Sequence, residues 1–298
     1  MLFNTYEPWK FAFSQETTDL EEIKTDKTKT KWGIIGVPFD STCSYHNGSR
    51  YAPITIREAS YGFEKYNTTL QKELTTKFYD FGDSNIIHGN CEKTCKIVEE
   101  NVTDLITNNI KPIIIGGEHS ISIAPIKALK NKHKINNTTI IHIDAHRDII
   151  DTYQEEKHSH ATIMKRIHEL KPKEIIQIGI RSSSKEEEDF VKKQNNIKTF
   201  TPQDLQKNFK KLIEYLNNIN NQIYITIDMD GLDPSIAPSV GNPTHNGLNA
   251  EQIQQIIKIL SKKEIIGLDV MEVATKKLGD ITSVLAAKII LDFLTLQN

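Results

Sequence analysis

Short apolar runs rich in β-branched residues alternate with longer amphipathic stretches along most of this chain. The runs predict strands at 32–37, 77–81, 111–115, 139–143, 174–180, 222–227 and 264–270. Between them, apolar residues recur every three or four positions, which predicts helices at 91–108, 119–129, 160–170, 202–217, 250–261 and 281–296. This alternation predicts an α/β fold in which helices cover both faces of a mainly parallel sheet.

The chain of 298 residues has room for one large α/β domain or two small ones. Residues 15–31 are polar and charged, and the rest of the chain contains no linker, internal repeat or low-complexity tract. We therefore expect one domain over residues 32–298, with residues 1–31 as an N-terminal arm or surface extension of that domain.

Two acidic clusters each follow directly on a strand-like run. They are Asp144-Ala145-His146-Arg147-Asp148 and Asp228-Met229-Asp230-Gly231-Leu232-Asp233. Side chains two positions apart on a strand point the same way, so the acidic and histidine side chains of each cluster converge. Carboxylates gathered at one sheet end repel each other unless a cation neutralises them. The clusters therefore predict a metal site.

Two further motifs follow predicted strands, namely Gly116-Gly117-Glu118-His119-Ser120 and Asp269-Val270-Met271-Glu272. Ligands of parallel α/β sheets bind beyond the carboxyl ends of the strands, so we expect all four motifs to meet on one rim. His119 would then add a nitrogen ligand. A site rich in carboxylates, with imidazole and without thiolate, favours manganese or magnesium over structural zinc. Two ions sharing carboxylates would activate water, which predicts hydrolysis.

Other polar residues near these motifs admit more than one role. Either His158 or His160 is a candidate for proton transfer, and the pattern alone does not choose between them. Glu272 ends the last predicted strand, where a carboxylate is either paired inside the protein or free to accept a cationic substrate. We expect His142 to face away from His146 and to belong to the core.

Composition excludes several classes of partner. Lysine and arginine number 37 against 39 acidic residues, so no overall field favours nucleic acid or an anionic membrane. No apolar stretch approaches the length of a membrane span, and the N-terminus lacks the pattern of a signal peptide. Three cysteines form no disulfide framework, although Cys91 and Cys95 have the spacing of a zinc half-site. We expect a cytoplasmic protein.

Taken in order, these motifs resemble those of the ureohydrolase family, which includes arginases and agmatinases. Residues 116–120, 144–148 and 228–234 look like its three metal motifs, although many members carry Asp where this chain has Glu118. Residues 267–273 look like its substrate-clamp motif. The resemblance continues through 36–40, 48–53, 79–83 and 280–282, and so covers the chain from about residue 32 to its end.

The resemblance implies a three-layer α/β/α fold with a mainly parallel eight-stranded sheet, and a homo-oligomer, either trimer or hexamer. It also implies two Mn²⁺ ions per chain, with Asp144 and Asp228 bridging them. The first ion would be held by His119, Asp144, Asp148 and Asp228, and the second by His146, Asp144, Asp228 and Asp230.

The resemblance further implies that an activated water attacks a guanidinium carbon and releases urea and an amine. His160 matches the family's proton-shuttle histidine, which decides against His158. Glu272 matches the acidic residue that grips the guanidinium, and Asp233 matches a carboxylate behind the metal ligands.

The substrate is expected to be a small cationic guanidino compound, most simply agmatine. The stretch 149–160 lacks the Asn- and Ser-rich pattern with which arginases grip an amino-acid head, and it resembles the agmatinase version. Arg181 follows a strand and is a candidate contact for an acidic substrate tail. Guanidinobutyrate, formiminoglutamate and arginine therefore remain alternatives. The loop 239–243 also departs from the Gly-Thr-Gly-Thr-Pro sequence of many relatives.

Two other classes compete with this interpretation. A deacetylase-type hydrolase shares the general fold but uses one zinc ion and fewer acidic ligands. A pseudoenzyme would bind a polyamine or a partner without turnover. Retention of all six ligand residues together with His160 and Glu272 favours the active dinuclear hydrolase.

Overall fold

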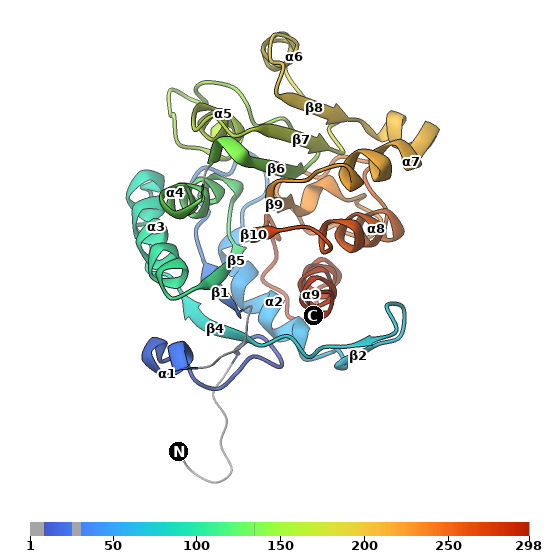
Figure 1. Ribbon diagram of the computed structural model, residues 1–298. Helices are drawn as coiled ribbons and strands as arrows, with labels where there is room; N and C mark the ends of the chain where they lie inside the picture. Colours follow the sequence, from blue (N-terminus) through green and yellow to red (C-terminus); the bar gives the residue numbers. More distant parts are fainter. Residues whose placement is uncertain (1–8, 26–30, 134, 298) are drawn as a thin grey trace.

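The computed structural model describes residues 9–25, 31–133 and 135–297, and its centre is an eight-stranded sheet (Figure 1). Every neighbouring pair of strands runs parallel, in the order β4-β1-β5-β10-β9-β6-β7-β8. The strands are β1 (Lys31–Val37), β4 (Phe78–Asp83), β5 (Ile110–Gly116), β6 (Thr138–Ile143), β7 (Glu174–Ile178), β8 (Ile197–Phe200), β9 (Gln222–Asp228) and β10 (Ile265–Met271).

Helices cover both faces of this sheet and complete three layers (Figure 1). One face packs against α1 (Leu20–Thr25), α3 (Cys91–Thr107), α4 (Ile123–Lys132), α5 (Ile163–Glu169) and α6 (Lys185–Val191). The other packs against α2 (Ala52–Ser60), α7 (Pro202–Asn217), α8 (Ala250–Leu260) and α9 (Ile281–Thr295). The expected α/β/α fold with a parallel eight-stranded sheet is confirmed.

Alternate residues of each strand enter different cores. On β5, Ile113 and Ile115 pack with the α2–α9 side, whereas Ile114 packs with the α3–α4 side. All seven residues of β1 are buried. A strand that is buried on both faces gains from apolar side chains at every position, which is why these strands are continuous β-branched runs rather than alternating ones.

The strand order brings distant parts of the sequence together. The chain forms β5 and later β6, but the last two strands, β9 and β10, are inserted between them. The four motifs singled out in the sequence follow β5, β6, β9 and β10, which are four adjacent strands. Their carboxyl ends therefore share one rim of the sheet, as expected.

Several elements were not predicted from the sequence. They are the edge strand β8, the helices α1, α2 and α6, and a two-stranded hairpin of β2 (Tyr66–Asn67) and β3 (Lys72–Glu73). The β8 strand has four residues, and Lys198 within it is exposed. An edge strand is only half covered and can be short and polar, so it lacks the apolar run that identifies a central strand.

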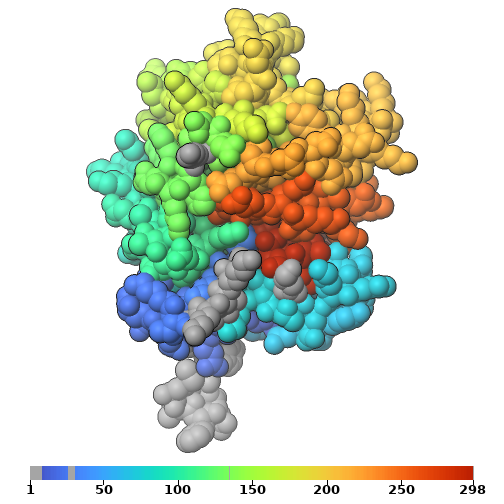
Figure 2. Space-filling model, in the orientation of Figure 1, coloured from blue at the N-terminus to red at the C-terminus, as the bar shows by residue number. Residues whose placement is uncertain are grey.

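Two peripheral segments are anchored by named contacts. Phe11 is buried against Phe78, and its N–H donates to Asp80 at 2.7 Å. The hairpin is tied to α9 by a hydrogen bond from Asn67 to Asp292, and Figure 2 shows the cyan hairpin segment beside the red C-terminal segment. No helix in the described part of the chain combines the length and apolarity that crossing a membrane requires.

Candidate metal centre and active site

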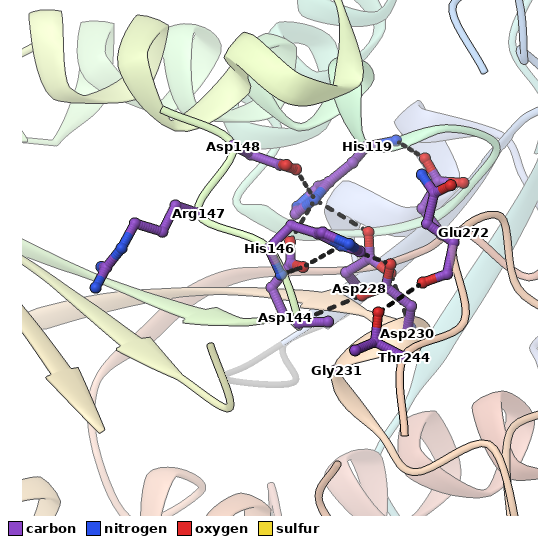
Figure 3. A network of polar contacts seen from close by, with 12 residues as sticks. His119, Asp144, His146, Arg147, Asp148, Asp228, Asp230, Gly231, Thr244 and Glu272 are labelled. Atoms are coloured by element: carbon purple, nitrogen blue, oxygen red, sulfur yellow. Dashed lines mark hydrogen bonds and ion pairs between the residues drawn. The ribbon is translucent and has the colours of Figure 1, made fainter. Parts of the chain in front are cut away.

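His119 lies at the centre of the rim, in a 3₁₀ turn (His119–Ser122) that follows β5. Gly117 allows this turn, because a Cβ atom there would lie 1.8 Å from the carbonyl oxygen of Phe39. The His119 Nδ1 atom lies 3.2 Å from Asp144 Oδ2, and 3.3 Å from an oxygen of both Asp148 and Asp228. Figure 3 shows these side chains pointing toward one another.

The other ring nitrogen fixes which tautomer of His119 is present. The Thr226 hydroxyl donates its proton to Asp269 Oδ1 at 2.6 Å, so it accepts from His119 Nε2 at 2.8 Å. Nδ1 then presents a lone pair toward three carboxylates, and it is a fully buried atom without a hydrogen-bond partner. A buried lone pair that faces carboxylate oxygens is stable only with a cation between them.

A second cluster lies beside the first and is more open. His146 Nδ1 lies 3.0 Å from Asp230 Oδ2 and 3.6 Å from Asp144 Oδ1, and the His146 side chain is 24% exposed. Asp144 contributes one oxygen to each cluster, so its carboxylate lies between the two histidines. Arg147, one position along, points away from the clusters (Figure 3) and donates to Gln177 and Glu188 instead.

The charges of these groups conflict in the absence of a cation. Burial and the charge of Asp144 raise the pKa of Asp148 to about 7. Burial and the charges of Asp230 and Asp144 also raise the pKa of Asp228 well above its ordinary value. Burial lowers the pKa of His146, but the charges of Asp230 and Asp144 outweigh it and raise the pKa to about 12. The pocket therefore favours positive charge, as protons or as metal ions.

Two residues of this site have a strained backbone conformation. Asp148 has φ +52° and Glu272 has φ +66°, and both lie in the left-handed region that non-glycine residues rarely adopt. Each carries one of the carboxylates that point into the pocket. Such strain persists where surrounding contacts hold the residue, and it clusters at functional sites.

The donor set fits metal ions. Three-residue or larger groups of potential ligand atoms occur here at His119, His142, Asp144 and Asp148, and at Asp144, His146 and Asp230. These groups contain five of the six side chains that the sequence suggested as ligands, and the sixth, Asp228, lies 3.3 Å from His119 Nδ1. The nitrogen and oxygen donors, without thiolate, match manganese or magnesium better than structural zinc.

His142 corrects one sequence-based expectation. It is fully buried, as expected. It does not face away from His146, because side chains at every second position of a strand point to the same side, and positions 142 and 146 are four apart. Its Nε2 atom lies 2.8 Å from Asp144 Oδ2. Gln177 accepts from Arg147 through its oxygen and therefore directs its NH₂ group to His142 Nδ1. His142 Nε2 is then protonated and donates to Asp144, so it is a hydrogen-bond donor to a candidate ligand.

The pocket above these clusters has a volume of about 460 Å³. Its lining includes Glu272 and His160, two residues to which the sequence assigned roles, but not His158. Glu272 Oε1 accepts the backbone N–H of His119 at 2.7 Å, and Gly241 leaves room for its other oxygen. Burial, followed by the charges of His146 and His119, lowers the pKa of His160 to about 4, so its ring is neutral near pH 7.

Two other candidates do not line the pocket. The Asp233 carboxylate accepts from the backbone N–H groups of Ser235 and Gly247, both at 3.0 Å. A hydrogen bond from the Ser235 side chain, together with these backbone bonds, lowers the pKa of Asp233 to about 2. The carboxylate holds the loop around Gly247 in place. Arg181 directs its guanidinium at backbone carbonyl oxygens, among them those of Thr244 and Asp230. Neither side chain faces the space above the clusters.

Sequence reasoning missed several residues of this pocket. Tyr45, Tyr153 and Glu187 line it, and Thr42 contacts His160 from behind. Their positions in the chain carry no spacing signal, because they come from loops and from a short helix. Cys91 and Cys95 lie with their sulfur atoms 3.8 Å apart in α3, both buried, and no described group of potential ligands includes them.

Comparisons with known proteins agree with this arrangement. The model of the Arginase family matches residues 30–295. An uncharacterized 32.2 kDa protein of Methanothermus fervidus is 42% identical, covering 96% of this chain and 97% of its own length. The N(1)-aminopropylagmatine ureohydrolase of Thermococcus kodakarensis is 35% identical, covering 94% and 96%.

Among solved structures, the agmatine ureohydrolase of Thermoplasma volcanium superposes with a TM-score of 0.81 and 32% identity, covering 90% of each chain. The match to the family model spans the whole sheet and all four motifs on its rim. The chain therefore belongs to the arginase family, as an agmatinase-like ureohydrolase that hydrolyses carbon–nitrogen bonds of amidines.

Proposed function

We propose that this protein is a dinuclear manganese enzyme that hydrolyses agmatine to putrescine and urea, a step of polyamine biosynthesis. The observation that carries the choice of substrate is the charge of the pocket. Carboxylates line it: Asp148, Asp228 and Asp230 would bind the metal ions, which leaves the charges of Glu187 and Glu272 to face the substrate, and among the described residues no lysine or arginine lines the pocket. A site of this kind favours a cation and disfavours a substrate with its own carboxylate.

The position of Arg181 strengthens this preference. It is the basic residue that the sequence suggested for an acidic substrate tail. Its guanidinium instead donates to the carbonyl oxygens of Gly179, Asp230, Gly231, Leu232, Thr244 and His245. A guanidinium committed to carbonyl groups has no donors left for a substrate carboxylate. Guanidinobutyrate, formiminoglutamate and arginine thus lose their candidate partner.

Two Mn²⁺ ions fit the two clusters. His119, Asp144, Asp148 and Asp228 would hold one, and His146, Asp144, Asp228 and Asp230 the other. Bound as a pair, such ions supply a water molecule that loses a proton near neutral pH. The orphaned lone pair of His119 Nδ1, surrounded by carboxylates, supports the first position.

The remaining residues would bind the substrate and move protons. Glu272 would pair with the guanidinium, because its carboxylate lines the pocket and is held by the N–H of His119. His160 would accept a proton that the attacking water gives up and pass it to the leaving amine, since its ring is neutral near pH 7 and also lines the pocket. Asp233 would contribute indirectly, because its carboxylate holds the loop around Gly247 in place.

A longer cation is the second candidate. The relative from Thermococcus kodakarensis is named for N(1)-aminopropylagmatine, which carries an additional ammonium group. Here Glu187, at the N-terminal end of α6, and the aromatic rings of Tyr45 and Tyr153 line the same pocket. A carboxylate and two aromatic faces would suit a second positive charge. The pocket volume of about 460 Å³ lies within the range of small-molecule sites.

The same family membership supports two further parts of the proposal. We expect a homo-oligomer, a trimer or hexamer, and we expect the protein to work in the cytoplasm. Light scattering of the purified protein would measure the first, and cell fractionation the second.

Urea release by the Mn²⁺-loaded protein tests the substrate. Agmatine, N(1)-aminopropylagmatine, arginine and 4-guanidinobutyrate would be compared at equal concentration. We expect the two substrates without a carboxylate to be hydrolysed at least ~100-fold more efficiently, because the pocket offers a carboxylate no partner. Efficient hydrolysis of 4-guanidinobutyrate would contradict the proposal. The Glu187→Gln variant separates the two cationic candidates, since it should impair the longer one selectively.

A further inference from the structure

We propose that Thr42, held by Glu118, is a positioning residue that fixes the tautomer and orientation of His160. The inference rests on the proposed function in one respect, namely that His160 transfers a proton during the reaction. The arrangement itself rests on hydrogen bonds. Thr42 lies in the loop that follows β1, and it reaches both Glu118 and His160 although they are 76 and 118 positions away.

Glu118 fixes Thr42 by two hydrogen bonds. The Thr42 N–H donates to Glu118 Oε2 at 2.7 Å, and the Thr42 hydroxyl donates to Oε1 at 2.7 Å. Ser120 also donates its hydroxyl to Oε1. Glu118 is fully buried, and its carboxylate is satisfied by these donors together with a longer contact from the Cys43 thiol at 4.0 Å. Thr42 is therefore held in place by both backbone and side chain.

The direction of the hydroxyl proton determines what His160 does. A hydroxyl has one proton, and that of Thr42 is used on Glu118. The hydroxyl oxygen can then only accept. It lies 3.1 Å from the backbone nitrogen of His160 and 3.2 Å from Nδ1 of the His160 ring. Nδ1 must carry a proton to make the second bond. The opposite nitrogen, Nε2, is left with the lone pair.

This tautomer suits the place of the ring. His160 lines the pocket, and Thr42 contacts it from the wall, so Nε2 on the other side of the ring is the nitrogen available to a substrate. The rings of Tyr153 and His160 form a T-shaped contact with centroids 5.3 Å apart, which limits rotation of the imidazole further. A nitrogen that exchanges a proton works only when it presents its lone pair in the correct tautomer.

The main experiment compares two substitutions at position 42. Thr42→Val keeps the shape and removes the hydroxyl, whereas Thr42→Ser keeps the hydroxyl. We expect Thr42→Val to lower kcat for agmatine by roughly 10- to 100-fold, with KM changed less than about twofold, because proton transfer is impaired and binding is not. Thr42→Ser should retain most of the activity. Equal losses in both variants would indicate packing and overturn the proposal.

A double-mutant cycle tests whether Thr42 acts through His160. In a His160→Ala background, Thr42→Val should cause no further loss, because the residue that it positions is gone. The same fold-loss in both backgrounds would overturn the proposal. Bound manganese is measured for each variant and should remain unchanged, since Thr42 contacts neither cluster. The unfolding temperature should fall for Thr42→Val in both backgrounds, because the buried Glu118 carboxylate loses the hydroxyl donor.

A spectroscopic measurement makes the test independent of turnover. Nitrogen-15 NMR of histidine side chains in the metal-free protein reports which ring nitrogen is protonated, with His160→Gln used for assignment. We expect His160 to carry its proton on Nδ1 in the unsubstituted protein, and a mixture of tautomers in Thr42→Val. A proton on Nε2 in the unsubstituted protein would overturn the proposal. If no guanidino compound is hydrolysed, the proposed function fails, but this measurement still decides the inference.

Discussion

The two ligand clusters differ in how they are enclosed and in what supports them. We name them the inner cluster (His119, Asp144, Asp148, Asp228) and the outer cluster (His146, Asp144, Asp228, Asp230). His119 is fully buried, whereas the His146 side chain is 24% exposed and lines the pocket. The inner cluster is therefore the more enclosed of the two, reaching the pocket through Asp148 and Asp228, whereas the imidazole of the outer cluster itself lines the pocket.

Support behind the clusters differs in the same way. Behind His119 stands a buried chain of hydrogen bonds through Thr226 to Asp269, which also accepts from Tyr224. The outer cluster is held mainly by main-chain donors, such as the N–H of Ala145 to Asp230 at 3.1 Å. Partners of this kind fix ligand orientation and tune metal affinity. We infer that the inner position is the better organised and binds metal more tightly.

The largest effect is expected from His119→Ala. Removal of the central nitrogen leaves three carboxylates facing one another, so the inner ion should be lost and the outer one weakened. Turnover should fall by roughly 1,000-fold or more, because activation of water depends on the metal pair. Elemental analysis and urea release measure this. The exposed His88→Ala is the control, and full activity of His119→Ala would refute the dinuclear assignment.

Asp230→Ala sharpens the comparison, because Asp230 belongs to the outer cluster alone. We expect one ion per chain to remain and turnover to fall by about 100-fold. Metal titration should show that the retained ion binds with nearly unchanged affinity. Loss of both ions from Asp230→Ala would show that the outer position cannot be emptied while the inner ion stays bound.

Glu272→Gln tests the residue that links the inner cluster to the pocket. A glutamine keeps an oxygen for the N–H of His119 but loses the charge that would pair with the guanidinium. Loss of a charge-assisted hydrogen bond is worth ~1.5–3 kcal/mol, so kcat/KM for agmatine should fall by roughly 10- to 100-fold. Metal content should not change. An unaltered kcat/KM would remove Glu272 from substrate binding.

The smallest effect is expected from Thr226→Val, which removes the hydroxyl behind His119. Manganese affinity at the inner position should fall by about tenfold, the lower end for a group that supports a ligand. Thr226→Ser, which keeps the hydroxyl, should bind normally. Isothermal titration of the metal-free variants measures both. Weakening of the outer ion instead would reverse our ranking of the two clusters.

Prediction from the sequence succeeded where burial dictates composition. Central strands such as β5 and β9 are buried on both faces, so their apolar runs identified them. The edge strand β8 and the short helix α6 escaped because partial exposure relaxes that requirement. The burial of His142 was predicted correctly, but the direction of its side chain was predicted wrongly. That direction follows from the two-residue period of β6 and not from the residue type.

The sequence by itself determined the residue types and their places at strand ends: the carboxylates and histidines of four motifs, and therefore the class of chemistry. Only the tertiary structure decided which of them meet, because β9 and β10 are inserted between β5 and β6. It also decided the surroundings, including the chain from Glu118 through Thr42 to His160 and the occupied guanidinium of Arg181. The physical reason is that strand runs reflect burial along the chain, whereas hydrogen bonds across the rim depend on which segments pack together.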